Sequence, residues 1–321
     1  MTIHARQADF VPADQAASLL WLLGQPQLED YLSFVATKVV GGDAIDCFAL
    51  AEEWRAANDH YHALEQAEEN DADRIRTRPL PAALARRAQA LRDDHQFRAT
   101  YDVVHTDIEM VELDRLIVWQ LQIDDRYALS RAAHLGRTPG PAALFDFCLQ
   151  PRDAGPPFTV RRLAADHYQF VSDATDFDAR DPRLLPPDML ATLAGHAPLS
   201  AALAVPIGAG ANFLSAIRSD NRLLLHNGYH RAYALRALGI KYAPCIVQTV
   251  TRRDELRYLA DPRVAEDPGF YYRAGRPPML RDYFDPRFAK RLCVYPIQAV
   301  VDVRVTVSTT LSTLLPAGGQ A

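Results

Sequence analysis

The sequence predicts an α+β protein in which a small mixed sheet with helices follows an all-helical N-terminal region. The first observation is that Arg222–Val250 reads as strand, turn, helix and strand with short connections. The second is that apolar residues repeat at helical spacing through much of residues 1–104. The third is that short apolar runs bounded by turn residues, typical of strands, begin near Asp107.

Composition is that of an ordinary globular protein. The chain has 321 residues, 49% hydrophobic and 23% charged, which suits one large domain or two smaller ones. The net charge of −5 disfavours a general affinity for nucleic acid. Because most basic residues are arginines, a catalytic lysine has few candidates, namely Lys38, Lys241 and Lys290.

Cysteine usage and the absence of a targeting segment favour a cytoplasmic protein. The cysteines are far apart and form no Cys-x-x-Cys pair or Cys/His cluster, so we expect reduced, mostly buried thiols. They are Cys47, Cys148, Cys245 and Cys293. We find no signal-peptide pattern, and no apolar run is long enough to span a membrane.

Residues 1–104 are predicted to be helical throughout. Asp14 is placed to cap a helix over residues 16–23, which Gly24 and Pro26 would end. Further helices are expected over residues 28–35, 44–70 and 82–97. This region offers no obvious chemistry.

Residues 105–250 are predicted to form the domain that carries the sheet, with a proline-rich insertion at about 137–200. Asp124 is placed to cap a helix that ends near Gly136. The other elements expected from residue 107 to residue 250 are strands near 108–118, 159–162, 168–171, 203–207 and 213–217 and a helix over 187–193. Residues 251–321 form a C-terminal extension with a helix over 254–259 and a strand within 292–309.

The predicted site is Asn227–Arg231, in the turn between the strand and the helix of Arg222–Val250. Main-chain N–H groups at a helix start lack partners and the helix dipole is positive there, so such a turn can hold a phosphate or carboxylate. Gly228 would let the main chain approach a ligand, and Asn227 is a good N-cap. Arg231 could bind an anion with two N–H groups, and His230 could donate to the same anion or move a proton.

Two other interpretations of this turn stay open. Asn-Gly is a common turn signal, and a histidine and an arginine can simply lie at a solvated helix start. His226 and His230 are four residues apart, which could indicate zinc, but one belongs to the strand and the other to the helix. We therefore assign no metal ligand.

The turn and its helix resemble the ParB/sulfiredoxin fold superfamily, whose ParB N-terminal-like members bind nucleotides. That pattern has a strand, a G-x-[H/R]-R turn, a helix of the form xxAxxxLG, and a strand of the form xxPxxV. The matching residues, in order, are Gly228-Tyr229-His230-Arg231, Ala234, Leu238-Gly239 and Pro244-Cys245-Ile246-Val247. The first strand of the family is similar to Ile108–Leu116, and the resemblance covers about residues 105–250.

The resemblance implies a nucleotide whose phosphates are held by Asn227–Arg231, with Gly228, His230 and Arg231 at the phosphate-binding positions. Tyr229 stands where sulfiredoxins have their catalytic cysteine, so their sulfur chemistry is not expected. No helix-turn-helix DNA reader is recognisable after residue 250.

Kinase-like members of the superfamily have the G-x-H-R form seen here and need a carboxylate as base. His230 with Glu112 or Asp124 would be the catalytic set, and Asp114 and Asp125 are further candidate acids. ATP or another nucleotide would be the cofactor, with Mg²⁺ bound by one of these acids.

Two functions follow as expectations. One is a phosphotransferase or NTPase that acts on a small molecule and holds the phosphates at the Gly228–Arg231 turn. The alternative is a non-catalytic binding or scaffold module for a protein or DNA partner, in which the turn holds an anion or nothing. Arg252, Arg253 and Arg257 are the residues that could favour DNA locally. The oligomeric state stays open, a homo-oligomer included.

Overall fold

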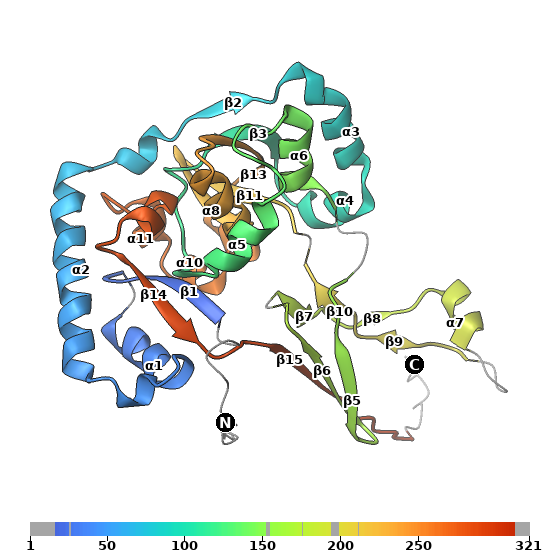
Figure 1. Ribbon diagram of the computed structural model, residues 1–321. Coiled ribbons are helices and arrows are strands. Elements are labelled where there is room, and N and C mark those ends of the chain that lie inside the picture. The colour runs from blue at the N-terminus through green and yellow to red at the C-terminus, as the bar shows by residue number, and fades with distance from the viewer. Residues whose placement is uncertain are drawn as a thin grey trace, which may run out of the picture. The chain divides into compact units, whose positions relative to one another are not determined.

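A computed structural model describes residues 17–25, 27–151, 155–174, 176–193, 199–210 and 212–311 of the chain (Figure 1). The chain forms two compact units. The first unit combines Met1–Asp153 with Ala211–Pro296, and the second combines Ala154–Gly210 with Ile297–Ala321. Each unit is described separately below.

A five-stranded mixed sheet in the order β12-β11-β13-β3-β2 is the centre of the first unit. Its strands are β2 (Thr77–Pro79), β3 (Thr106–Glu112), β11 (Ser215–Ser219), β12 (Arg222–Asn227) and β13 (Tyr242–Thr249). Strands β11 and β13 run parallel, and the other neighbours are antiparallel. The predicted strand, turn, helix and strand over Arg222–Val250 are confirmed, with helix α8 at Tyr229–Ala237.

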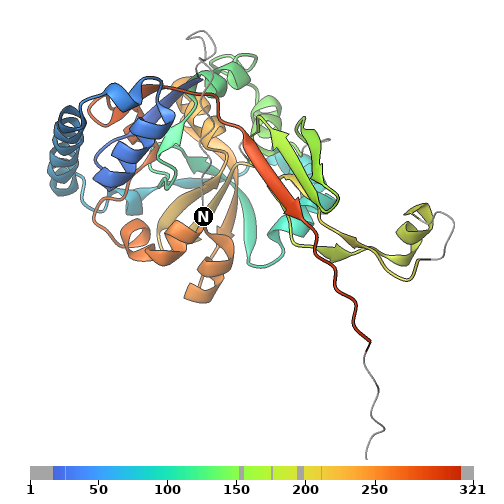
Figure 2. The same cartoon turned by 90° about the horizontal axis from the view of Figure 1, so that it is seen from below.

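Helices cover both faces of this sheet. On one face lie α8, α5 (Asp125–Ala132) and α6 (Pro141–Leu149), and on the other lie α9 (Arg253–Leu259), α10 (Pro262–Glu266) and α11 (Pro268–Tyr272) (Figure 2). The alternation of side chains along β12 explains the two cores, because Leu223 and Leu225 join the α8 side and Leu224 joins the other. As predicted, the Asp124 carboxylate caps α5, accepting from the Tyr127 N–H at 2.7 Å.

A second sheet in the first unit corrects the prediction of an all-helical N-terminal region. Residues 16–23 were expected to be helical, but β1 (Ala17–Leu22) lies between β14 (Ala289–Val294) and β4 (Gln122–Ile123) in an antiparallel sheet. Leu19 to Leu23 are all buried. A short apolar run has no periodicity to separate strand from helix, and its partner strand is more than 260 residues away. The predicted cap Asp14 lies outside the described residues.

Helices elsewhere in the N-terminal region agree with the prediction more closely. Helix α1 is Leu28–Lys38 and α2 is Cys47–Ala67. The single helix expected over 82–97 is instead α3 (Ala85–Asp93) and α4 (His95–Tyr101), because the Asp94 carboxylate caps α4 through the N–H groups of the two residues after His95. In the described part of this unit, short 3₁₀ helices η2 to η5 lie at Gly42–Ala44, Asp71–Arg74, Ala82–Leu84 and Leu280–Phe284.

The second unit contains most of the predicted insertion together with the last strand. Its main sheet has the order β15-β6-β5, with β5 at Thr159–Ala164, β6 at His167–Ser172 and β15 at Ala299–Arg304. Two smaller pairs join β7 (Phe177–Ala179) to β10 (Ile207–Ala209) and β8 (Arg183–Leu184) to β9 (Leu203–Ala204). Helix α7 is Pro187–Leu193, as predicted. The C-terminal extension is therefore shared, since residues 251–296 belong to the first unit.

Within the part of the chain that the structure describes, no helix has the length and apolar character needed to cross a membrane.

Candidate functional site

The turn at the start of α8 is built around Gly228. This residue is the N-cap of the helix, with φ 91° and ψ 26° in the left-handed region, one residue later than the cap predicted at Asn227. The Asn227 side chain instead accepts a hydrogen bond from the Gly228 N–H at 2.6 Å. Glycine adopts this conformation without the strain that other residues meet.

Packing, and not ligand approach, explains the lack of a side chain at Gly228. A Cβ added there would lie 2.8 Å from Leu214 Cδ1 and 3.0 Å from Leu214 Cα. The missing Cβ therefore admits the chain that leads into β11, where Leu214 is fully buried. The prediction was that Gly228 lets the main chain approach a ligand. The residue that approaches it is instead Leu214.

Tyr229 faces the core. Its side chain is 4% exposed, and its hydroxyl donates to the Leu225 carbonyl at 2.8 Å. The hydroxyl oxygen of Tyr229 also accepts from the Trp119 N–H at 3.1 Å and from the Gln120 N–H at 3.4 Å. Burial raises the pKa of Tyr229 well above its usual value. Its side chain thus joins the 119–120 segment to β12, so only the main chain of Tyr229 is left to take part in the predicted phosphate site of Asn227–Arg231.

His230 and Asp124 are brought together, as the predicted catalytic set requires, but through the main chain. The Asp124 N–H donates to His230 Nε2 at 3.3 Å, while the Asp124 carboxylate caps α5. The His230 ring packs edge-on against Tyr127, with ring centroids 5.2 Å apart. This contact fixes the position of the His230 ring beside the start of α5.

Glu112 is not brought to the turn. Asn227 is level with Ser215 in β11, Ile246 in β13 and Ile108 in β3. Glu112 lies four residues beyond Ile108, about 13 Å further along β3, and two strands separate β3 from β12. Its carboxylate accepts from the Arg76 N–H at 2.9 Å and pairs with Arg115. The prediction of Glu112 as the catalytic base therefore does not agree with its position.

The two other candidate acids are also held in ion pairs. Asp114 accepts from Arg236 Nε at 2.8 Å, near the other end of α8. Asp125 is buried and pairs with Arg291, and Ser18 donates to it at 3.4 Å.

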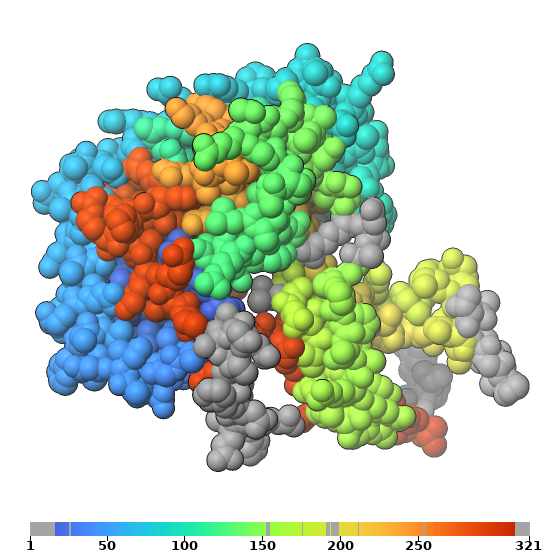
Figure 3. Space-filling view, in the orientation of Figure 1, coloured from blue at the N-terminus to red at the C-terminus, as the bar shows by residue number. Residues whose placement is uncertain are grey.

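Arg231 extends from the turn into a cavity. It is 6% exposed, and its Nη1 donates to the main-chain carbonyl of Asn212 and, at 3.4 Å, to that of Cys148. The cavity has a volume of about 530 Å³, within the range of small-molecule sites. It is lined by Arg131, His134, Leu135, Thr138, Pro139, Gly140, Ala143, Asp146, Phe147, Gln150, Pro151, Asn212 and Arg231. The segment that carries α5 and α6 lies at the molecular surface (Figure 3).

The charges that line this cavity favour an anion. Arg131 and Arg231 are cationic, and the imidazole of His134 can donate a hydrogen bond. The one carboxylate of the lining, Asp146, is held by Arg87 Nη1 at 2.7 and 2.9 Å, which offsets its charge. The N-cap of helix α6, Gly140, is part of the lining and provides no side-chain cap, so the positive dipole end of this helix adds to the same field.

Cys148 and Cys245 carry fully buried thiols. Cys148 is fully buried, and burial raises the pKa of its thiol to about 12. Burial also raises the pKa of Cys245 well above its usual value. With pKa values raised in this way, neither thiol forms a thiolate near neutral pH.

Arg231 is the one lining residue that was predicted as a site residue, and Arg131, His134 and Asn212 are among those that were missed. They lie 19 to 100 residues before Arg231, so no local pattern connects them to the turn. The one local indication was the helix start predicted at Asp124, which places Arg131 near the end of α5, while His134 follows this helix, which ends at Ala132.

Searches of family models, curated proteins and solved structures found no match to this chain. Among the residues that the structure describes, no group of three or more His, Cys, Asp or Glu side chains is placed to hold a metal ion.

Proposed function

We propose that this chain is a nucleotide-binding protein that holds a phosphate group in the cavity at the start of α8. The observation that carries the proposal is that Arg231, from the turn, lines the same cavity as Arg131 and His134 of the α5 segment. Arginines bind phosphate oxygens with pairs of N–H groups, and a partly enclosed site strengthens this attraction.

The order of the elements supports a nucleotide as the bearer of the phosphate. Strand β3, the β11–β12 hairpin, α8 and β13 follow one another as in the ParB/sulfiredoxin pattern. In that pattern the phosphates meet the start of the helix, where Arg231 lies in this chain. The cavity volume of about 530 Å³ also exceeds what a bare phosphate needs.

The positions of the candidate acidic side chains fit best with a protein that binds the nucleotide without transferring or hydrolysing its phosphate. Glu112 is remote and paired with Arg115, and the Asp124 carboxylate is used as a helix cap. A general base must come within hydrogen-bond reach of the proton that it removes. Transfer or hydrolysis of the phosphate is a second candidate on one observation, that the Asp146 carboxylate lines the cavity and could act as base or Mg²⁺ ligand.

A thermal-shift panel with ATP, ADP and CTP, each with Mg²⁺, tests the proposal. Saturation by a ligand that binds only the folded state, at about 100 times its dissociation constant, adds about 2.7 kcal/mol to the unfolding free energy. We expect at least one nucleotide to raise the melting temperature and the Arg231→Ala change to remove the shift.

Phosphate release and transfer to small hydroxyl compounds, serine among them, are then measured on the same samples. A shift without turnover supports the binding protein, and turnover that an Asp146→Asn change removes supports the second candidate. Absence of a shift with every nucleotide would leave the non-catalytic scaffold module as the better account.

A further inference from the structure

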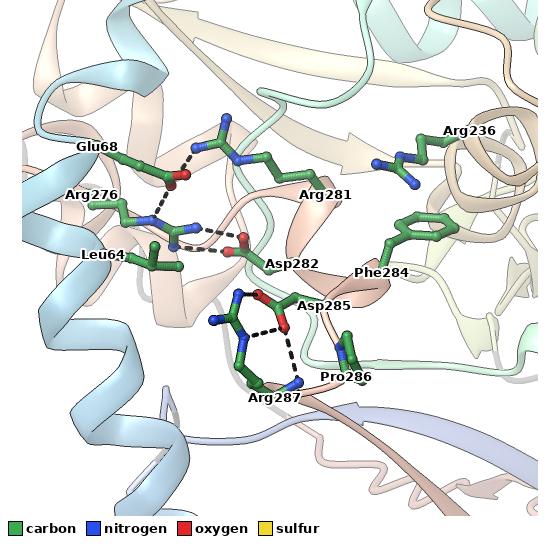
Figure 4. Close-up of a pocket in the computed structure, with 10 residues that line it drawn as sticks. All are labelled: Leu64, Glu68, Arg236, Arg276, Arg281, Asp282, Phe284, Asp285, Pro286 and Arg287. Atoms are coloured by element: carbon green, nitrogen blue, oxygen red, sulfur yellow. Dashed lines mark hydrogen bonds and ion pairs between the residues drawn. The ribbon is translucent and has the colours of Figure 1, made fainter.

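A second cavity lies at the opposite end of α8 and is larger, about 610 Å³ (Figure 4). Helix α8 contributes Arg236, from its last turn, to this cavity, and Arg231 to the other. The remaining lining comes from the end of α2 and from residues 276–287. Nothing in the nucleotide proposal uses this cavity.

Most charges in the lining are already neutralised by one another. Arg276 is 1% exposed, and its guanidinium contacts both oxygens of Asp282 at 2.7 and 3.1 Å and Glu68 at 2.8 Å. Arg281 pairs with the same Glu68 oxygen, and Arg287 contacts both oxygens of Asp285 at 2.8 and 3.0 Å. These groups form the fixed walls of the cavity.

Arg236 is different, because its terminal nitrogens are not used. Its Nε donates to Asp114 at 2.8 Å, and its guanidinium lies 4.0 Å from the centre of the Phe284 ring. Among the described residues, its Nη1 and Nη2 have no hydrogen-bond or ion-pair partner. Figure 4 likewise draws no contact from Arg236 to another lining residue, and shows its guanidinium directed toward the cavity.

The aromatic support holds this guanidinium in place. The Phe284 ring stacks on Tyr233 at 4.7 Å with the ring planes 16° apart. A guanidinium on an aromatic face loses less freedom when it binds a planar partner with its two terminal N–H groups. The arrangement is therefore preorganised for a carboxylate.

We propose that this cavity binds a small organic acid through a salt bridge from its carboxylate to the terminal nitrogens of Arg236. The apolar body of the acid contacts Leu64, Phe284 and Pro286, which are part of the lining. A monocarboxylate fits better than a phosphate, because Glu68, Asp282 and Asp285 already offset the charges of the other three arginines, which leaves the single charge of Arg236 to be matched.

A purely structural role of Arg236 explains less. A cation in the last turn of a helix is favourable, and the ion pair with Asp114 adds to it. Both partners are substantially exposed, at 33% and 45%, and such pairs contribute little to stability. Neither effect requires that the side chain also line a cavity with its hydrogen-bond donors directed inward.

Calorimetric titration of the full chain with benzoate and hexanoate, at low ionic strength, tests the proposal, with neutral benzamide as the control ligand. We expect both acids to bind and benzamide not to. Arg236→Gln should weaken binding by about tenfold or more, as for loss of a hydrogen-bonded charge. Asp114→Asn should tighten it by about two- to fivefold, because it removes the competing partner of Arg236.

Arg55→Gln is the matched control, since Arg55 lies on α2 in an exposed pair with Glu52 and lines neither cavity. Arg236→Lys keeps the positive charge but not the planar guanidinium, and should also bind the acids weakly. This second variant keeps the test valid if the glutamine variant does not fold. No heat with either acid, or equal affinity of the wild type and both Arg236 variants, would overturn the proposal. Nucleotide binding at the other cavity is measured separately, so that each site can fail alone.

Discussion

The guanidinium of Arg231 donates a hydrogen bond to the main-chain carbonyl of Asn212. This contact ties the start of α8 to the chain that enters β11, and it places a buried positive charge in the wall of a cavity. Arg231 therefore has two roles that a sequence pattern cannot separate. It holds the turn together, and it gives the cavity a cation.

Gly228 is predicted to be required for folding. Gly228→Ala should lower the unfolding free energy by about 2–4 kcal/mol, since left-handed strain of about 1–2 kcal/mol adds to the clash with Leu214. Gly239→Ala is the control, because its φ is also positive, 83°, while an added Cβ would meet nothing within 4 Å. Urea unfolding of both variants measures the difference, and equal losses would show that Leu214 can move aside.

The hydroxyl of Tyr229 is predicted to matter for stability and not for ligand binding. Tyr229→Phe leaves the Leu225 carbonyl and the Trp119 N–H without this partner, at a cost of about 1–3 kcal/mol. Tyr258→Phe serves as the control, since that side chain is 84% exposed. Nucleotide affinity of the folded Tyr229→Phe protein should equal that of the wild type, and a large loss of affinity would return this residue to the binding site.

His226 is predicted to make the protein less stable in mild acid. Burial lowers its pKa below the usual 6.5, and nearby Asp261 opposes this only in part. The unfolded chain therefore takes up a proton more readily, so the unfolding free energy falls as the pH is lowered through 6.5. Urea titrations at pH 7.5 and 5.5 should show a smaller change in His226→Gln than in the wild type. An identical change in the two proteins would mean that this ring is readily protonated in the folded state.

Thiol labelling is predicted to divide the cysteines into two classes. Cys47 and Cys293 are exposed and should react with a disulfide reagent in the native protein at pH 8. Cys148 and Cys245 are fully buried with raised pKa values and should react only after denaturation. Native-state labelling followed by mass mapping checks this. Rapid modification of Cys148 would show that the core beneath α6 opens on the labelling timescale.

Local patterns in the sequence predicted the central part of the fold. Turn residues and helical spacing locate β12, α8 and β13 to within a few residues, and the Asp124 cap locates α5. These features depend on residues close together in the chain. The β1 strand could not be recognised, because its partner β14 comes from the far end of the first unit.

Of the residues that line the candidate site, the sequence identified only Arg231. Sequence alone cannot tell that Tyr229 faces the core or that the missing Cβ of Gly228 faces Leu214, since both depend on how α8 packs on the sheet. Nor could it select among the acids. Glu112 lies in a plausible strand, but the strand order places two other strands between β3 and β12.

The central claim is that the cavity at the start of α8 binds a nucleotide through its phosphates. Calorimetric titration of ATP and CTP with Mg²⁺ into the wild type and into Arg131→Gln tests it most directly, because Arg131 lines the cavity from α5 and is less deeply buried than Arg231. Arg55→Gln again controls for the loss of one arginine. We predict binding by the wild type and by Arg55→Gln, and about tenfold or greater weakening in Arg131→Gln. The account would be contradicted if neither nucleotide bound, or if Arg131→Gln bound as tightly as the wild type.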